Sequence, residues 1–425
     1  MKLSARQIRA RHRRRLVLAA FALAAITFAV APGSAGAATP VTHWSQVAEQ
    51  TISVGRGPAS SQQLSGVVHA AIYDAVAATE GGLVPFASFP AVAAGASTDA
   101  AVATAARDVL VARVPLQAAT IEAAYDLFMG TVPDGEAKTA GIAVGVEVAA
   151  DQLAARAGDG FGVAVPFLQR SPGPGVFEPV LPTAPVETSL SQMQPFTFAS
   201  SDFRPNGPSR LASDVYARDF AEVKAYGRVD SSVRTDAQTQ TARFWTDQTY
   251  VQWSRTVRQL AEARLLNVRE SARLLGLVHV AAGETVTACY EAKYHFNFWR
   301  PIDAIRRADT DGNPATTPDR TWTHLVAANH PEYPSGHSCF TGSVTEALAI
   351  FFKTNRVPLT VSSNAANAGP PRSYERLSAV RADVDNARVW SGLHFRNSMV
   401  EGSKVGRKVA HAVAPHFFRQ PYDGS

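Results

Sequence analysis

The chain has 425 residues, of which 46% are hydrophobic and 18% charged, so it can bury a large core and is not generally disordered. Its formal net charge is +5, but residues 1–38 hold seven of the 41 basic residues and none of the 36 acidic ones. Without them, 34 basic residues face 36 acidic ones and the net charge is −2. The charge argument for a nucleic-acid partner therefore disappears.

The first 38 residues have the three parts of a secretory signal peptide. Basic residues fill 2–15, an apolar run follows over 16–31, and small residues follow over 34–38. We therefore expect cleavage near Ala37 or Ala38 and a secreted or extracytoplasmic product, with an uncleaved N-terminal anchor as the alternative. No later apolar run is long enough to cross a bilayer, so we expect the mature chain to have no membrane span.

Helical spacing of apolar residues predicts an N-terminal helical half over residues 39–160. Apolar residues between 64 and 76 recur at this spacing. Further helices are expected at 100–114, 116–128 and 139–156, with Pro115 dividing the first two and Gly158 ending the last.

Residues 161–210 contain nine prolines, which predicts a long irregular connection. A C-terminal helical half is expected over 211–425. Its predicted helices lie at 213–226, 236–247, 252–266, 268–300, 335–353 and about 393–413. Loops are expected at 302–334 and 357–373. The pattern indicates an all-α protein with few strands, if any.

Lys293 and Arg300 are seven residues apart near the end of the helix expected over 268–300. Two helical turns would place both side chains on one face, about 10 Å apart along the axis, from where they could converge on a small anion. Pro301 would then end the helix. A solvated cationic face explains an isolated pair of this kind equally well.

Ser335, Gly336 and His337 come directly before apolar residues at helical spacing, so we expect them at a helix N-terminus. Unpaired N–H groups and the positive end of the helix dipole make such a terminus an anion site. The serine hydroxyl can donate a further hydrogen bond, and the histidine can act as acid or base. A capped helix start with an incidental histidine is the alternative.

Arg388 offers a guanidinium suited to two hydrogen bonds with an oxyanion, and His394 follows six residues later. Taken alone, the pair could be a surface arginine and a core histidine. The two cysteines, Cys289 and Cys339, lie close in sequence to these motifs. Export permits a disulfide, which we favour over two buried free thiols.

The ordered set K-x6-RP, PSGH and R-x5-H resembles the motifs of vanadium-dependent haloperoxidases and type 2 phosphatidic acid phosphatases. The likeness is nearest to the exported bacterial haloperoxidase-like branch. It extends from the segment around His69 and Asp74, through Trp245, to about residue 417. The resemblance implies an all-helical fold of two helical bundles, with a site for vanadate or phosphate in the C-terminal half.

The resemblance also implies roles for the motif residues. His394 would be the ligand of vanadium, and His337 the acid–base residue. The oxyanion would be held by Lys293, Arg300, Ser335, Gly336 and Arg388. With vanadate as cofactor, the partners would be hydrogen peroxide, which Lys293 polarises once it is bound, a halide oxidised to hypohalous acid, and a small organic acceptor.

His330 lies seven residues before His337. The bromoperoxidases of the family resemble this chain in having a second histidine there, which favours bromide. A loop histidine hydrogen-bonded to the backbone explains it as well.

One position departs from the family pattern. The last motif usually continues H-x3-D, with the aspartate orienting the histidine, but Ser398 stands at this position. A different group, such as Asn397, Glu401 or a backbone carbonyl, must then orient His394.

Two other functions fit the same residues. An exported acid phosphatase would use His394 as the nucleophile, giving a phosphohistidine, and His337 as the acid for the leaving group. An exported protein could also bind an oxyanion without turnover. The sequence leaves open vanadate against phosphate, the halide, the organic substrate and the oligomeric state.

Overall fold

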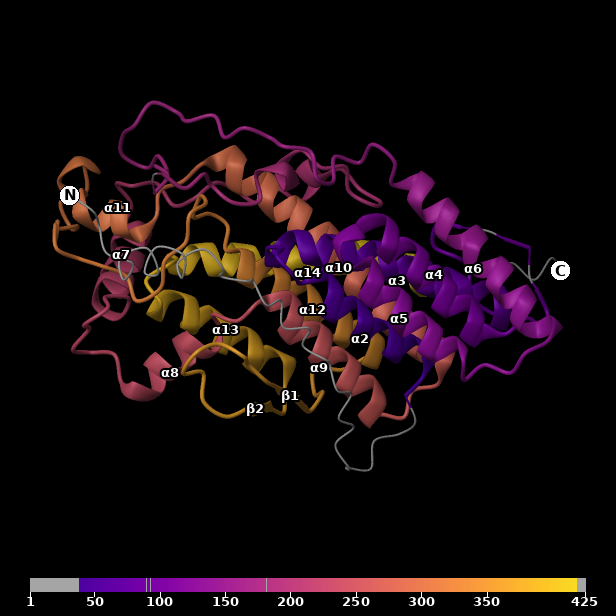
Figure 1. The fold of residues 1–425 in the computed structure, drawn as a ribbon. Helices are drawn as coiled ribbons and strands as arrows, with labels where there is room; N and C mark the ends of the chain where they lie inside the picture. Colours follow the sequence, from indigo (N-terminus) through magenta and orange to yellow (C-terminus); the bar gives the residue numbers. More distant parts are fainter. Residues whose placement is uncertain (1–37, 89, 92, 181, 419–425) are drawn as a thin grey trace, which may run out of the picture. The chain divides into compact units, whose positions relative to one another are not determined.

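The computed structural model describes residues 38–88, 90–91, 93–180 and 182–418. The expected signal peptide lies outside the described residues except for its last position. The regular secondary structure of the described residues is almost entirely helical, with one short two-stranded hairpin (Figure 1). Among them, no helix combines the length and apolar character that crossing a membrane requires.

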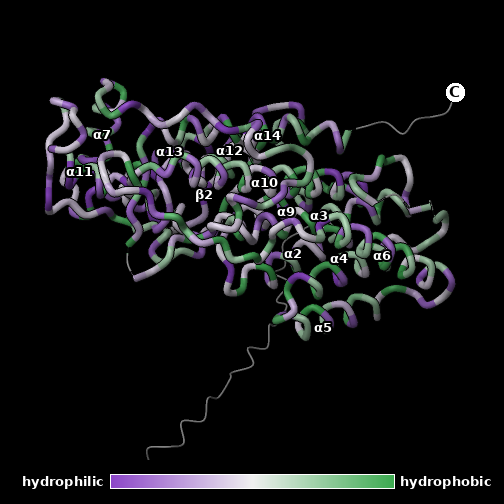
Figure 2. The backbone as a smooth tube through the Cα atoms, turned by 90° about the horizontal axis from the view of Figure 1, so that it is seen from above, coloured by the Kyte–Doolittle hydropathy of each residue, from purple (hydrophilic) through white to green (hydrophobic). Residues whose placement is uncertain are grey.

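Five helices and one short 3-10 turn form the N-terminal part. They are α2 (Pro40–Ile52), α3 (Pro58–Glu80), α4 (Thr98–Arg113), η1 (Pro115–Gln117), α5 (Ala118–Met129) and α6 (Glu136–Ala155). The predicted helices are found within a few residues of their expected bounds. Helix α3 packs against α4, α6 and α10, and hydrophobic stretches run along α3, α4 and α6 (Figure 2).

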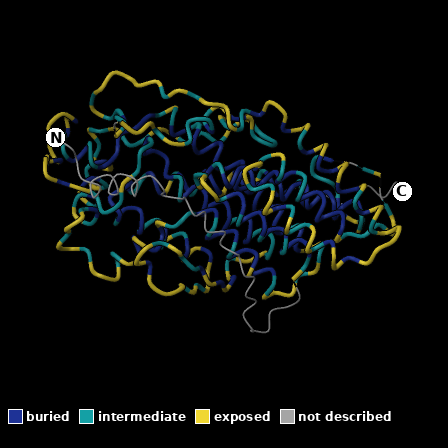
Figure 3. The backbone as a smooth tube through the Cα atoms, viewed as in Figure 1, coloured by how far each residue is buried: buried dark blue, intermediate teal, exposed yellow. Residues whose placement is uncertain are grey.

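In its described residues, the Pro-rich connection has no helix longer than two 3-10 turns, η2 (Thr188–Ser191) and η3 (Ser200–Phe203), as the prolines predicted. It is fixed to the C-terminal part by backbone hydrogen bonds. The N–H of Phe177 donates to the carbonyl of Asn297 (2.9 Å), and the N–H of Val186 donates to that of Asn329 (3.0 Å). Much of it lies at the exposed rim (Figure 3). That it divides the chain into two domains stays a prediction.

The C-terminal part has eight helices among the described residues, with the 3-10 turn η4 (Ala308–Thr310) and a hairpin. The hairpin pairs β1 (Leu359–Val361) with β2 (Arg372–Tyr374) in antiparallel register. The helices are α7 (Asp214–Tyr226), α8 (Asp236–Phe244), α9 (Thr249–Ala263), α10 (Val268–Phe296), α11 (Pro301–Arg306), α12 (Gly336–Phe352), α13 (Leu377–Trp390) and α14 (Arg396–Phe418).

Helices α10, α12 and α14 pack together and carry much of the buried core, and α10 also packs along α3 (Figures 1 and 3). The closest approach depends on glycine. A Cβ atom on Gly406 of α14 would lie 2.0 Å from the carbonyl oxygen of Cys339 in α12. Only a residue without a side chain lets these two backbones meet.

The helix prediction was wrong around Arg300. Helix α10 ends at Phe296, because Asn297 takes a left-handed conformation (φ 51°). Arg300 lies just outside the next helix, and Pro301 begins α11 instead of ending α10. Proline suits a first helical position, where an N–H has no partner in any case. The argument from two helical turns therefore does not explain how Lys293 and Arg300 are placed.

Further elements were not predicted, among them helix α11 and the turn η4, which lie almost entirely within the loop expected at 302–334. Helix α13 lies in a segment to which we assigned no structure, and the hairpin lies mostly within the loop expected at 357–373. Helix α13 is amphipathic and buries residues such as Val380 and Val384, so its apolar spacing was there to be recognised.

Candidate functional site

A cavity of about 470 Å³, which we name the central cavity, lies where the three motifs meet. The motif residues that line it are Arg300, His330, Gly336, His337, Arg388 and His394. Part of the remaining wall comes from the start of α3, from Glu187 of the Pro-rich connection and from Tyr290 of α10. Stretches remote in sequence thus come together, and Lys293 and Ser335 are buried beside them without lining the cavity.

The second motif begins helix α12, as predicted. Ser335 is the N-cap, and its hydroxyl oxygen accepts the N–H of Ser338 at 3.4 Å. Gly336 is the first helical residue and lines the cavity. The hydroxyl group of Ser335 still has its proton to donate, and the first N–H groups of α12 have no partner inside the helix.

His337 presents one ring nitrogen without a protein partner. Its Nε2 is buried and has no hydrogen-bond partner in the described part of the chain, while the carbonyl of Trp245 accepts a hydrogen bond from the ring. That bond must come from Nδ1–H, which leaves the Nε2 lone pair free. Burial, with the charges of Arg388 and Lys293, lowers the pKa of His337 well below its usual value, so the ring is neutral.

Arg300 joins the second and third motifs. Its Nε donates to the carbonyl of His330 (2.7 Å) and its Nη1 to that of Leu393 (2.9 Å). The same Nη1 lies 3.3 Å from Nε2 of His394, and Nη2 lies 2.9 Å from Nδ1 of His330. Burial lowers the pKa of Arg300 to about 10, so the guanidinium stays charged at neutral pH.

Arg388 is held at the end of α13 by the same carbonyl that fixes His337. Its Nη1 donates to Trp245 at 2.8 Å, while its Nε is buried without a partner among the described residues. Burial, and then the charge of Arg300, lowers the pKa of Arg388 to about 9. The site therefore keeps two guanidinium charges and at least one free donor.

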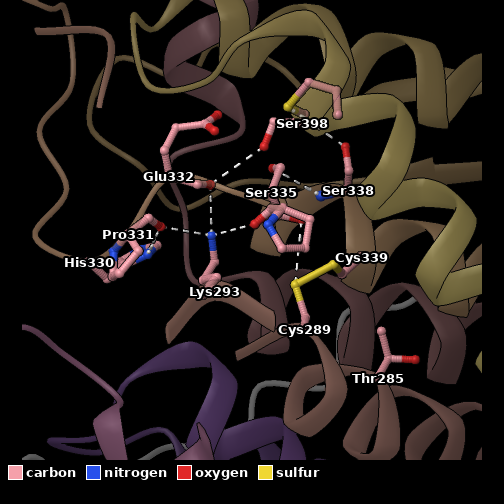
Figure 4. Close-up of a disulfide and its surroundings, with 12 residues drawn as sticks. Thr285, Cys289, Lys293, His330, Pro331, Glu332, Ser335, Ser338, Cys339 and Ser398 are labelled. Atoms are coloured by element: carbon pink, nitrogen blue, oxygen red, sulfur yellow. Dashed lines mark hydrogen bonds between the residues drawn. A yellow bond between two sulfur atoms is a disulfide. The ribbon is translucent and has the colours of Figure 1, made fainter. Parts of the chain in front are cut away.

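Lys293 is placed differently from the expectation. Its Nζ donates to the carbonyls of Pro331 (3.1 Å), Glu332 (3.0 Å) and Pro334, and the side chain is fully buried (Figure 4). Because an ammonium group has three N–H donors, all are used. Lys293 can therefore bind an anion directly only if it releases one of these carbonyls. Burial lowers its pKa well below the usual value.

The group that contacts His394 is Glu332, which we had not considered. Its Oε1 lies 2.8 Å from Nδ1 of His394. Neither alternative named from the sequence takes that place: the N–H of Asn397 donates to Asp219, and Glu401 pairs with Lys404. Sequence spacing could not reveal this contact, because positions 332 and 394 are brought together only by the tertiary fold.

The two cysteines form a disulfide that joins α10 to α12 (Figure 4). Cys289 lies one helical turn before Lys293, and Cys339 one turn after Ser335. The favoured alternative for the cysteines is therefore confirmed, and the bond ties the helix that carries the lysine to the helix that begins at the cavity.

With this geometry described, the chain can be compared with known proteins. Residues 273–422 match the family model of the second helical-bundle domain of vanadium chloroperoxidase. A stretch of 98 residues is 32% identical to the vanadium chloroperoxidase of Curvularia inaequalis, and covers 20% of this chain and 15% of that protein. The C-terminal part of the chain is therefore similar in sequence to the vanadium haloperoxidases.

Solved structures show a likeness in fold over nearly the whole chain. A bacterial vanadium-dependent iodoperoxidase matches with a TM-score of 0.74 and 18% identity, over 91% of this chain and 97% of that one. A bacterial vanadium-dependent chloroperoxidase in its holo form matches with a TM-score of 0.70 and 17% identity, over 88% and 95%. The prediction of an all-α, haloperoxidase-like fold of helical bundles is confirmed.

The matched domain, residues 273–422, contains every residue of the three motifs named from the sequence. The cavity wall formed by the start of α3 and by Glu187 lies outside it. The sequence match spans 15% of the length of the curated relative, so that protein's activity is not carried over on identity alone.

Proposed function

We propose that the chain is a vanadate-dependent haloperoxidase that uses hydrogen peroxide to oxidise a halide, with bromide favoured, to hypohalous acid. The observation that carries the proposal is the central cavity, where two buried guanidinium groups and three neutral imidazoles face one space. We call its residues Arg300, Gly336, His337, Arg388 and His394 the cradle. The hypohalous acid would halogenate a small organic acceptor.

A tetrahedral oxyanion such as vanadate fits the cradle. The unpartnered Nε of Arg388 and the N–H groups at the start of α12 are donors waiting for an acceptor. The hydroxyl of Ser335 would add one donor. Lys293 would add positive charge close by, and a direct contact after release of a carbonyl. Bound vanadate would supply a Lewis-acidic centre that activates peroxide toward halide.

The two histidines would have separate tasks. His394 would be the protein ligand of vanadium, through the Nε2 atom beside Arg300. His337 would accept a proton from hydrogen peroxide at Nε2, because Trp245 holds its other nitrogen as a donor and its lowered pKa keeps it neutral. His330, whose ring nitrogens lie 2.9 and 3.3 Å from Nη2 of Arg300, would tune the halide preference.

The test is a pair of assays on one protein preparation loaded with orthovanadate. We expect peroxide-dependent bromination of a phenolic dye and no hydrolysis of p-nitrophenyl phosphate. His394→Ala should abolish bromination, whereas His411→Ala, which changes an exposed histidine on α14, should not. Phosphatase turnover without bromination would replace the proposal with the exported acid phosphatase. Bromination by protein freed of vanadate would contradict the assigned cofactor.

The signal-peptide pattern supports export as part of the same proposal. Detection of the mature chain outside the cytoplasm, with an N-terminus near residue 38, would test it.

A further inference from the structure

Glu332 is a fully buried carboxylate that faces the proposed vanadium ligand. It lies in the loop before α12, two residues after His330. Its Oε1 accepts the backbone N–H of Phe395 at 3.0 Å and lies 2.8 Å from Nδ1 of His394. An ionised carboxylate has no proton to donate, so Oε1 accepts from both groups and the ring proton lies on Nδ1.

The opposite side of the ring leads to the same assignment. Nε2 of His394 lies 3.3 Å from Nη1 of Arg300. A guanidinium group only donates hydrogen bonds, so Nε2 must be the acceptor and must carry a lone pair. The two contacts agree on one tautomer, with hydrogen on Nδ1 and the lone pair on Nε2, and the shorter contact with Glu332 holds it more strongly than the 3.3 Å contact with Arg300. A metal-binding imidazole needs this form.

The backbone of Glu332 is fixed from three sides. Its N–H donates to the carbonyl of Phe298 at 2.9 Å, and its carbonyl accepts from Lys293 at 3.0 Å. The hydroxyl of Ser398 lies 3.5 Å from the same carbonyl oxygen (Figure 4). The carboxylate is thus held in place before any ligand binds, and the three occupied donors of Lys293 serve this arrangement.

We propose that Glu332 is the positioning residue of His394, which holds the ring and fixes its tautomer so that the Nε2 lone pair points into the cavity. It would replace the aspartate that the family usually carries four residues after this histidine, where this chain has Ser398. Lys293 then acts on the site through the Glu332 loop as well as by its charge. The consequence for vanadate rests on the proposed function, but the tautomer does not.

The first experiment reads the tautomer without any activity assay. Long-range ¹H–¹⁵N NMR of the ¹⁵N-histidine-labelled apo protein distinguishes Nδ1–H from Nε2–H, and the His394→Asn variant assigns the signal. We expect Nδ1–H for His394 in the wild type and a mixture of tautomers in Glu332→Ala. Glu332→Gln should keep Nδ1–H, because its amide oxygen can still accept. An Nε2–H wild type, or an unchanged tautomer in Glu332→Ala, would overturn the proposal.

The second experiment moves the carboxylate from position 332 to position 398 and measures vanadate binding. Orthovanadate affinity, measured by calorimetry, should fall about 10- to 100-fold in Glu332→Ala. The double variant E332A/S398D returns a carboxylate to the family position, and should recover most of the affinity and the Nδ1–H tautomer. A merely structural role of Glu332 predicts no such rescue, so its absence in a folded double variant counts against the proposal.

The control is Glu401→Gln, which changes a carboxylate of α14 that pairs with Lys404 and does not contact His394. It should leave the tautomer and the affinity unchanged. If Glu332→Ala does not fold, E332A/S398D and Glu332→Gln carry the test. If His394 has the Nδ1–H tautomer but the protein brominates no substrate, the proposed function is rejected. The role of Glu332 in positioning His394 is then retained.

Discussion

The chain buries two clusters of imidazoles, and only one of them lines the central cavity. In the N-terminal cluster, His69 of α3 and His279 of α10 stack with ring centroids 3.8 Å apart. The cradle histidines instead face a cavity beside two arginines. A buried histidine therefore does not by itself indicate a binding site. A cavity lined by hydrogen-bond donors that have no partner indicates one better.

Most polar atoms of the N-terminal cluster are used internally, although Nε2 of His279 is buried without a partner among the described residues. Nδ1–H of His69 donates to the carbonyl of Ser65 (2.8 Å), and its Nε2 accepts from the hydroxyl of Ser45 (3.1 Å). Nδ1 of His279 lies 3.0 Å from the Ser65 hydroxyl. The nearby Arg258 is paired with Glu49 at 2.6 Å, whereas no carboxylate is paired with Arg388 in the described residues. Both clusters combine histidine with arginine, and they differ in the groups that pair with these side chains.

The largest expected effect tests whether the cradle is held covalently as well as by packing. The disulfide closes a loop between residues 50 apart, which in the chain-entropy account contributes about 4 kcal/mol. The double variant C289A/C339A should lose stability of this order in urea unfolding, and cradle affinity for orthovanadate should fall with it. A loss below about 1 kcal/mol would mean that packing alone holds α10 and α12 together.

The next largest expected effect is the pH dependence of the unfolding free energy that His69 of the N-terminal cluster produces. Burial lowers the pKa of His69 from 6.5 to about 4. At pH values between these two pKa values, His69 is protonated in the unfolded chain and neutral in the folded chain. The stabilisation is thus complete above pH 6.5 and is lost as pH falls towards 4, by up to about 3 kcal/mol. Unfolding free energies at pH 7 and pH 5 should differ less in His69→Asn than in the wild type.

The histidines of the cradle also resist protonation, so the comparison must be between variants and not between pH values alone. His411→Asn serves as the matched control, because this residue is 63% exposed on its side chain. It should keep the wild-type pH dependence. An equal dependence in His69→Asn would show that the N-terminal cluster does not contribute.

The same contrast explains what the sequence could predict. The order of the motifs and the helix start at Ser335 follow from local patterns, because capping and apolar periodicity act over a few residues. The end of α10 at Asn297 and the contact of Glu332 with His394 do not. One depends on a left-handed C-cap before a proline, and the other on a loop brought to a helix start 62 residues away.

Lys293 illustrates the same limit. Its residue type and its place in the motif predicted an anion ligand, but three carbonyl groups of the loop at 331–334 take up its donors. The sequence shows which residues are cationic, but it does not show which hydrogen-bond acceptors the fold places beside them. This is why the cradle could be predicted as a set while the partner of each member could not.

A smaller expected effect distinguishes Arg388, which lines the central cavity, from Arg258, which pairs with a carboxylate. Arg388→Gln removes a charged donor from the cradle, and should weaken orthovanadate binding about 10- to 100-fold, since a hydrogen bond to a charged group contributes about 1.5–3 kcal/mol. Arg258→Gln breaks the ion pair with Glu49 beside the N-terminal cluster. It should lower stability and leave anion affinity unchanged. Calorimetry and urea unfolding on both variants measure the two effects, and equal anion affinities would contradict the contrast.

The smallest expected effect comes from Ser45→Ala, which leaves Nε2 of His69 without its hydrogen-bond donor. One neutral hydrogen bond is lost, so unfolding should become easier by about 1 kcal/mol. If unpartnered buried imidazole nitrogens were enough to make a site, this variant would add Nε2 of His69 to the unpartnered Nε2 of His279 and would bind a second phosphate or vanadate. We expect none in calorimetry, because His279 covers one face of the ring and His69 is only 1% exposed. A second binding event would mean that free nitrogen atoms matter more than space and positive charge.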